Sequence, residues 1–323
     1  MNNIITYFYL EPKAQSSICG VNEKDYTKKN EYYFRCNVDL FYSSLHFNKN
    51  CRHYFIINDA SNLDFINNFD FKKFCSEKGI EIIEQKSKYV RQQKAWAGCM
   101  YLFDAIEYFK ENNLVNDDDN YIFLDNDILF NGSIENIVNK DFDYMCYNII
   151  HEFQCENNFN GLDISNNKEI SNCYGGEFFA LKGKNISTIL NIFKDIYMKY
   201  DYFTEEHYLS HILSGEKKKG KAVVEVNDSL KRCWTTFKYF NGKKEDRALT
   251  ILHLPSEKEY GLYWCSKRFI KHDEYNRAAA LRLCSVGKRN FFVCCRKLMK
   301  NISKKFKTLV KEKKKVRYFG IET

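Results

Sequence analysis

The chain has 323 residues, of which 44% are apolar and 16% aromatic, enough for one large α/β domain or two smaller ones. This composition excludes a disordered or fibrous protein, and no segment repeats at a fixed period. The net charge is +8, but residues 288–317 contain thirteen Lys or Arg and one acid, so the rest of the chain carries −4. A basic tail on a mildly acidic domain does not indicate a nucleic-acid partner.

The N-terminal sequence MNNIITYFYL contains no basic region, no small-residue cleavage site and no apolar run long enough for a membrane span. We therefore expect no signal peptide, and we expect the mature chain to start where the sequence starts. The thirteen cysteines are scattered, with no Cys-x2–4-Cys pair that would suggest zinc. We interpret them as reduced thiols in a cytosolic protein.

Strand and helix patterns alternate through the first third of the chain. Residues 3–10, 53–59 and 80–84 are apolar runs typical of buried strands. Residues 37–46 and 63–78 have helical spacing, and Gly79 is a plausible helix stop. The alternation predicts a mostly parallel sheet.

Further helices and strands follow in the rest of the chain. We predict helices at 92–112 and 186–199 and a third that starts at Thr204 and ends before Gly215. Further strands are predicted at 144–150, 173–181, 223–226 and 249–254. Because no linker precedes residue 280, we expect one domain over 1–280 and a basic amphipathic helical tail over 281–323.

The stretch YIFLDNDILF, residues 121–130, puts Asp125 and Asp127 directly after four apolar residues. Side chains at i and i+2 of an extended chain point to the same side, with Cα atoms roughly 6 to 7 Å apart. The pair should lie at the carboxyl end of a buried strand, where open α/β sheets bind ligands. Two such carboxylates suit Mg²⁺ or Mn²⁺ and a bound phosphate.

Other interpretations of the acidic pair remain open. Two acids at the end of a strand can be solvated and have no function. Phosphatases of the haloacid-dehalogenase type also carry a DxD after a strand, although no Asp-x3-Asp or Asp-x4-Asp pair follows Asp127 here. A calcium loop is a poor fit, because the segment lacks the glycine and the closing glutamate of that motif.

The order of several motifs resembles that of the nucleotide-sugar glycosyltransferases of the GT-A fold. These motifs are IIND, FLDND, YGGEFF, TEEH and the late HLPSEK, spread over residues 4–264. YGGEFF with TEEHYLSHIL is similar to the retaining blood-group-type enzymes, whereas HLPSEK is closer to the glycogenin-like family. The resemblance implies a Rossmann-like α/β sheet flanked by helices, and a metal-dependent transfer of sugar from a nucleotide-sugar, with a UDP-sugar as the expected donor.

The resemblance also implies roles for individual residues. Asp125, Asp127 and His253 would hold Mn²⁺ or Mg²⁺, and Lys258 would neutralise the diphosphate. Glu206, with Glu205 beside it, would lie under the anomeric carbon and act as a nucleophile or stabilise an oxocarbenium-like transition state. If the enzyme inverts, the same acid would be a general base on the acceptor hydroxyl. The remaining assignments are Asp59, Arg91 and Asn126 to the nucleotide, and Gly175, Gly176, Glu177 and Trp96 to the donor sugar or the acceptor.

The basic tail has apolar residues at steps of three or four from residue 291 to 309, so a helix there would be amphipathic. Such a helix is typical of binding to an anionic membrane surface. We therefore expect residues 288–317 to hold the protein at the cytoplasmic face of a membrane, close to a glycan or lipid-linked acceptor. A membrane-binding module without catalysis is the non-enzymatic alternative.

Overall fold

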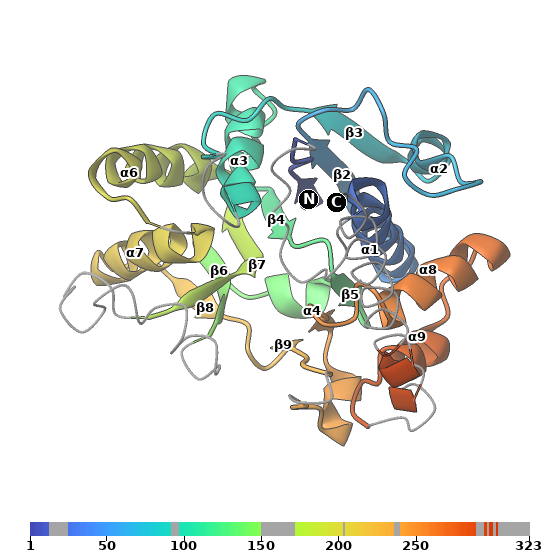
Figure 1. Ribbon diagram of the computed structural model, residues 1–323. Helices are drawn as coiled ribbons and strands as arrows, with labels where there is room; N and C mark the ends of the chain where they lie inside the picture. The colour runs from blue at the N-terminus through green and yellow to red at the C-terminus, as the bar shows by residue number, and fades with distance from the viewer. Residues whose placement is uncertain are drawn as a thin grey trace, which may run out of the picture.

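The computed structural model describes residues 1–12, 25–91, 97–149, 172–202, 204–235 and 240–288, together with 294, 295, 297–299 and 302. Helices and strands alternate as far as β4, and elements of one kind also follow each other beyond it (Figure 1). The strands are β1 (Asn2–Phe8), β2 (Arg52–Ile57), β3 (Ile80–Glu84), β4 (Asn120–Leu124), β5 (Ile128–Phe130), β6 (Tyr144–Asn148), β7 (Tyr174–Lys182), β8 (Val223–Glu225), β9 (Leu230–Arg232) and β10 (Ile251–His253). The α-helices are α1 (Tyr26–Phe47), α2 (Phe71–Glu77), α3 (Tyr101–Glu111), α4 (Glu135–Val138), α6 (Ile186–Lys199), α7 (Glu205–Lys218), α8 (Gly261–His272) and α9 (Arg277–Leu283).

The central sheet has seven strands in the order β3-β2-β1-β4-β7-β6-β8. The first four are parallel, β7 runs antiparallel to both β4 and β6, and β8 is parallel to β6. The predicted mostly parallel α/β sheet is therefore confirmed. Because β1 and β4 are parallel neighbours, their carboxyl ends open at the same edge of the sheet.

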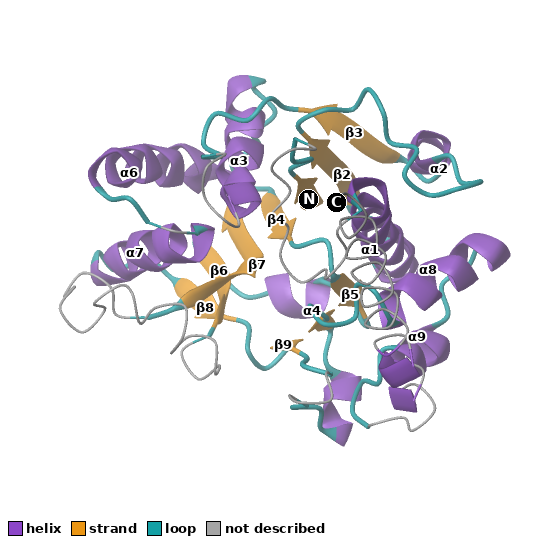
Figure 2. Cartoon of the chain, viewed as in Figure 1, coloured by secondary structure: helices purple, strands orange, loops and turns teal. Residues whose placement is uncertain are grey.

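Each face of this sheet has its own hydrophobic core. Ile4 and Ile122 point to one core, which includes residues of α1, α2 and α8. Ile5 and Phe123 point to the other, which includes residues of α3, α6 and α7. The alternation follows from the two-residue period of a strand. Helices cover both sides of the sheet, as Figure 2 shows.

A second, smaller sheet completes the carboxyl edge, with the order β5-β10-β9. The stretch YIFLDNDILF contributes to both sheets, because β4 of the central sheet ends at Leu124 and β5 of the smaller sheet begins at Ile128. The residues between them turn at the junction of the two sheets. Asp125 and Asp127 therefore lie at the end of β4, as predicted, but not inside one continuous strand.

Two predicted helices have different bounds in the structure. The helix predicted at 37–46 begins eleven residues earlier, at Tyr26, where the Asp25 carboxylate accepts from the backbone N of Lys28. The helix predicted at 63–78 forms only over α2, because Asp70 caps its start by accepting from the backbone N of Lys73. Leu63 and Ile66 are buried without being helical.

The predicted stop at Gly215 is wrong, since α7 continues to Lys218 and a left-handed glycine, Gly220, follows it. Of the helix predicted at 92–112, the described part is a 3-10 turn, η1 (Ala97–Met100), followed by α3. The domain boundary predicted at residue 280 falls within α9. Most of the predicted tail helix lies outside the described residues.

Candidate functional site

A cavity of about 210 Å³ opens at the carboxyl ends of β1 and β4. Its walls come from the end of β1, the β4–β5 turn, the start of α7, the end of β9 and the segment after β10. Its size suits part of a small ligand. The lining residues are Tyr7, Phe8, Tyr9, Glu11, Tyr33, Gly98, Cys99, Asp125, Asn126, Asp127, Thr204, Glu205, Glu206, Arg232, Trp234, His253, Pro255 and Lys258.

Strand pairing brings three potential metal ligands together in this cavity. In the small sheet His253 lies opposite Ile128, the residue after Asp127. His253 Nε2 is 3.3 Å from Asp127 Oδ2 and 3.8 Å from Asp125 Oδ2. One ligand atom from each of the three residues lies within 4.8 Å of the others. The structure therefore brings the predicted Asp-Asp-His set into one cluster.

The charges of the cluster show that it favours a cation. Burial, together with the neighbouring Asp127, raises the pKa of Asp125 to about 6. Although burial opposes the shift, Lys258 and His253 hold the pKa of Asp127 well below its usual range. Against its own burial, His253 has its pKa raised to about 9, mainly by Asp127. Two oxygens and one imidazole nitrogen that attract positive charge fit a divalent ion such as Mn²⁺ or Mg²⁺.

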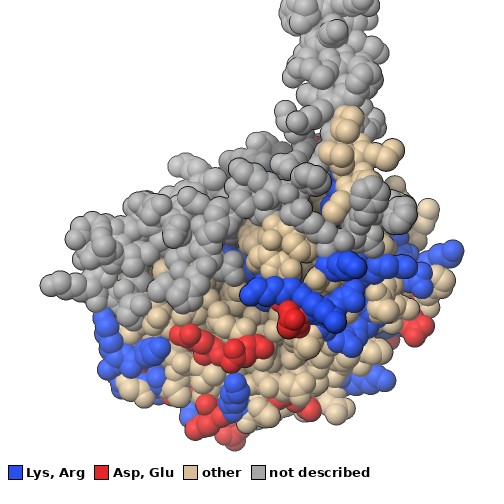
Figure 3. Space-filling model, turned by 90° about the horizontal axis from the view of Figure 1, so that it is seen from below, with Lys and Arg blue, Asp and Glu red and all other residues tan. Residues whose placement is uncertain are grey.

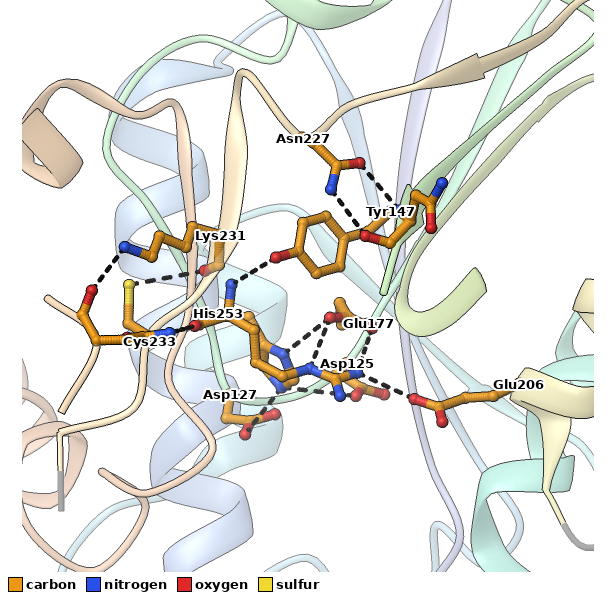
Figure 4. A network of polar contacts seen from close by, with 12 residues as sticks. Asp125, Asp127, Tyr147, Glu177, Glu206, Asn227, Lys231, Cys233 and His253 are labelled. Carbon is orange, nitrogen blue, oxygen red and sulfur yellow. Dashed lines mark hydrogen bonds and ion pairs between the residues drawn. The ribbon is translucent and has the colours of Figure 1, made fainter. Parts of the chain in front are cut away.

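Next to His253, Glu177 and Arg232 form a buried ion pair (Figure 4). Glu177 Oε1 lies 3.4 Å from His253 Nδ1, and the Glu177 side chain is fully buried. Arg232 donates to both Glu177 oxygens, at 2.9 and 2.8 Å. Despite burial, Arg232 and His253 lower the pKa of Glu177 to about 2. A carboxylate at the far nitrogen of a histidine ligand is a common way to fix its tautomer and direction.

The sheet register explains why these residues meet. In β9 and β10, Arg232 is the register partner of His253. The last paired residues of β4 and β7 are Leu124 and Phe178, and the backbone N of Asp125 donates to the carbonyl of Glu177 at 3.2 Å. The pairing of β4 with β7 therefore brings Asp125 next to Glu177, and the pairing of β9 with β10 brings Arg232 next to His253. All four residues lie within one site.

The wall at the start of α7 carries the two glutamates predicted to be catalytic. Glu206 Oε1 accepts from Arg232 Nη2 at 3.0 Å, so one guanidinium joins Glu206 to Glu177 (Figure 4). Burial raises the pKa of Glu206, and Arg232 opposes that shift. Glu205 Oε2 is buried with no hydrogen-bond partner within the described part of the chain. Burial, then the charges of Glu206 and Asp125, raise the pKa of Glu205 well above its usual range.

The two glycines predicted to approach a ligand make room for these carboxylates instead. A Cβ on Gly175 would overlap the Glu177 carboxylate, and a Cβ on Gly176 would overlap that of Glu205. Neither glycine lines the cavity. Their absent side chains leave room for the carboxylates of Glu177, in the same strand, and Glu205, at the start of α7.

Lys258 lies in the cavity and pairs with Asp127. Asn126 also reaches the cavity wall, but its amide nitrogen donates to Thr6, Tyr7 and Asn37, at 2.8 to 3.2 Å, and so ties the β4–β5 turn to β1 and α1. Glu177 stands behind the wall and not in it.

Three other predicted residues are not part of this cluster. Asp59 is exposed beyond the end of β2, where it accepts from the backbone N of Ser61 at 2.9 Å. Arg91 pairs with Asp201 and donates to the Tyr197 hydroxyl. Trp96 falls outside the described residues.

Sequence patterns did not reveal Arg232 or the aromatic walls of the cavity. Arg232 is one of fifty basic residues and sits in the three-residue strand β9, too short for a periodic pattern. Tyr7, Tyr33 and Trp234 look like ordinary strand and helix aromatics. The two glycines that precede Glu177 are a local sign that little space surrounds its carboxylate.

No family model matches the chain, and no curated protein matches its sequence. Among solved structures, apo WbbM, a bifunctional glycosyltransferase, aligns with a TM-score of 0.50 and 9% identity over 78% of this chain. This chain spans 45% of the length of that protein.

Two further solved structures align at lower TM-scores. The galactosyltransferase LgtC in complex with donor and acceptor sugar analogs aligns over 84% of this chain and 94% of its own length, at 12% identity and a TM-score of 0.47. Mouse xyloside xylosyltransferase 1 aligns over 78% of this chain and 97% of its own, at 10% identity and a TM-score of 0.43. The likeness to WbbM, together with the sheet order, confirms that the chain has the GT-A fold.

Proposed function

We propose that this protein is a metal-dependent glycosyltransferase that moves a hexosyl or N-acetylhexosaminyl group from a nucleotide-sugar to a glycan or lipid-linked acceptor. The observation that carries the proposal is the Asp125-Asp127-His253 cluster facing Glu205 and Glu206 across one cavity. The GT-A fold, shared with a glycosyltransferase, supports it. A cation site next to carboxylates suits a reaction in which a diphosphate leaves and positive charge develops on a sugar.

The first part of the site would bind the diphosphate of the donor. A divalent cation, Mn²⁺ or Mg²⁺, held by Asp125, Asp127 and His253 would polarise the phosphate oxygens and stabilise the leaving group. Lys258 already lies at Asp127 and would add a second positive charge beside the leaving oxygen. Because Lys258 is buried, its charge acts in a low dielectric.

The second part would act on the sugar. Glu206 is held by Arg232, so its carboxylate has a fixed direction in the wall of the cavity. There it would stabilise an oxocarbenium-like transition state or attack as a nucleophile, which is the basis for proposing a retaining transfer. Glu205 is buried next to it with a strongly raised pKa, so it is suited to donate a hydrogen bond to a sugar hydroxyl.

A binding experiment tests the nucleotide and metal site. We expect UDP with Mn²⁺ to raise the melting temperature of the wild type, and each alone to raise it much less. In Asp127→Asn the combined effect should disappear, because one ligand charge is lost. The exposed Asp64→Asn is the matched control, and it should behave as wild type. Loss of UDP binding in Asp59→Asn would support the predicted role of Asp59 at the nucleotide.

An activity experiment tests the reaction. Incubation with a panel of UDP-sugars and Mn²⁺ should release UDP, and Glu206→Gln should lower kcat at least 100-fold while the affinity for UDP stays within a few-fold of wild type. NMR of the product anomer reads the stereochemistry. Phosphate release from a phosphomonoester, with no release of UDP from any UDP-sugar, would favour the phosphatase alternative.

We also propose that the tail places the protein on the cytoplasmic face of an anionic membrane. Leu298, Met299 and Ile302 are more than half exposed in a segment rich in Lys and Arg. Lys and Arg also gather on part of the face seen from below in Figure 3. No helix among the described residues is long and apolar enough to cross a membrane. Deleting residues 288–323 should abolish binding to phosphatidylserine vesicles, and unchanged binding contradicts the proposal.

A further inference from the structure

A buried glutamate next to the cavity has no role in the site described above. Glu257 is fully buried in the turn between β10 and α8. Its Oε2 accepts from the backbone N of Gly261, the first residue of α8, at 2.8 Å. A Cβ on Gly261 would lie 2.6 Å from that oxygen, so the glycine makes room for the carboxylate. Its other oxygen, Oε1, accepts from the Thr235 hydroxyl.

The positive charge opposite Glu257 comes from the basic segment after the domain. Lys297 Nζ forms an ion pair with Glu257 Oε1 and lies 3.4 Å from the carbonyl oxygen of Thr235. It also lies 5.7 Å from the centre of the Tyr260 ring. The Lys297 side chain is only 13% exposed. Lys297 is therefore packed into the domain, unlike Leu298 and Met299 beside it.

The two segments joined by Glu257 both continue into the cavity wall. Lys258, which pairs with Asp127, is the residue after Glu257. Trp234, another lining residue, directly precedes Thr235. Ser256 strengthens the same link, because its hydroxyl lies 2.9 Å from that of Thr235. The position of Glu257 therefore determines the positions of both Lys258 and Trp234.

We infer that Lys297 is a positioning residue of the active site: its ammonium neutralises Glu257, and Glu257 then holds Lys258 and Trp234 against the cavity. This inference rests on the proposed function for its link to donor binding. Removing the ammonium leaves the buried Glu257 carboxylate without its charged partner, which costs free energy of folding. The turn then moves toward water, which solvates the charge. The basic segment therefore contributes to the donor site as well as carrying exposed apolar residues.

The test uses the full chain and five variants. Lys297→Met removes the charge and keeps most of the side chain, whereas Lys297→Arg keeps the charge. Glu257→Gln removes the carboxylate charge, and the double variant removes both. Lys288→Met, at an exposed basic residue of the same segment, controls for loss of tail charge.

The first measurement needs no ligand. Hydrogen exchange should become at least tenfold faster in peptides covering residues 230–235 and 254–262 of Lys297→Met, and stay unchanged in β1 to β3. Lys297→Arg and Lys288→Met should match the wild type. The double variant should exchange more slowly than Lys297→Met, because no buried charge is left unpaired. Unchanged exchange in Lys297→Met overturns the inference.

The second measurement separates positioning from simple support of the fold. The affinity for UDP with Mn²⁺ should fall about tenfold in Lys297→Met at a temperature where the protein is fully folded, and Lys297→Arg should restore it. A lower melting temperature with unchanged affinity means that Lys297 only supports the fold, which also overturns the inference. If the wild type binds no UDP, the proposed function fails, and hydrogen exchange alone decides on Lys297.

Discussion

Gly176 shows how one absent methyl group positions a carboxylate in the cavity wall. Its place in β7 faces the start of α7, and a Cβ there would overlap the Glu205 side chain. The glycine is therefore required by close packing and not by an unusual backbone angle, since its φ is not positive. A residue that does not line the cavity can still control where a functional group lies.

We predict that Gly176→Ala lowers kcat at least tenfold, because Glu205 must leave its place and its neighbour Glu206 shares the first turn of α7. Steady-state kinetics with the best donor and a urea unfolding curve measure the effect. Gly215→Ala is the control: a Cβ at this helical position meets open space, so it should stabilise α7 by about 1 kcal/mol and leave kcat unchanged. Equal losses of activity in both variants would contradict the explanation.

Single residues also show where the sequence was informative about the site. Asp125, Asp127, His253, Lys258 and Glu206 were predicted from local motifs, and the structure places all of them at one cavity. Arg232 was not predicted, because its two carboxylate partners are 55 and 26 residues away in the sequence. Contacts over such separations depend on strand pairing, which a local pattern does not specify.

Among the elements, β2 carries a buried histidine that makes stability depend on pH. His53 is 3% exposed, and its Nε2 lies 2.8 Å from the Ser44 hydroxyl of α1. Burial lowers its pKa from 6.5 to about 4. Because the folded protein holds this histidine neutral, its contribution to stability is fully present above pH 6.5. That contribution is lost as the pH falls toward 4.

We predict that His53 accounts for a loss of about 3 kcal/mol of unfolding free energy between pH 6.5 and 4, which is 1.36 kcal/mol per pKa unit. In His53→Gln the urea unfolding free energy should change less over this range than in the wild type. The exposed His272→Gln is the matched control and should follow the wild-type curve. If the unfolding free energy of His53→Gln changes with pH as much as that of the wild type, His53 in β2 is not the source of the pH dependence.

Some predicted element bounds match the structure, among them the helix at 186–199, and others do not. The strand predicted at 80–84 has the bounds of β3, because a short apolar run between turn residues is a strong local signal. The helix predicted at 63–78 was too long, because Leu63 and Ile66 are buried by tertiary packing in a non-helical segment. The spacing of apolar residues indicates which residues are buried, and it indicates a helix only where the backbone is regular.

At the scale of the whole molecule, the site joins parts of the chain that lie far apart in sequence. The cavity takes residues from the end of β1 near residue 7 and from the segment that follows β10 near residue 258. Ligand binding to such a site stabilises the folded chain as a unit, since the unfolded chain has no site.

We predict that UDP and Mn²⁺ at 100 times their dissociation constant raise the unfolding free energy by about 2.7 kcal/mol. The melting temperature should rise by a few degrees. Differential scanning calorimetry measures the shift, and EDTA should reverse it. Mg²⁺ in place of Mn²⁺ tests which ion the site prefers, whereas Ca²⁺, a larger ion, should give a smaller shift. A shift that survives EDTA would mean that nucleotide binding does not use the Asp-Asp-His cluster.

The sequence by itself determined the α/β class, the position of the acidic pair at a strand end and the concentration of basic residues in 288–317. These features depend on local patterns of apolar, acidic and basic residues, which act within a few positions. Only the tertiary structure decided that β5 leaves the main sheet, that Arg232 joins Glu177 to Glu206, and that Lys297 reaches Glu257. These contacts join residues from 26 to 55 positions apart, and the pairing of strands and the packing of helices select them.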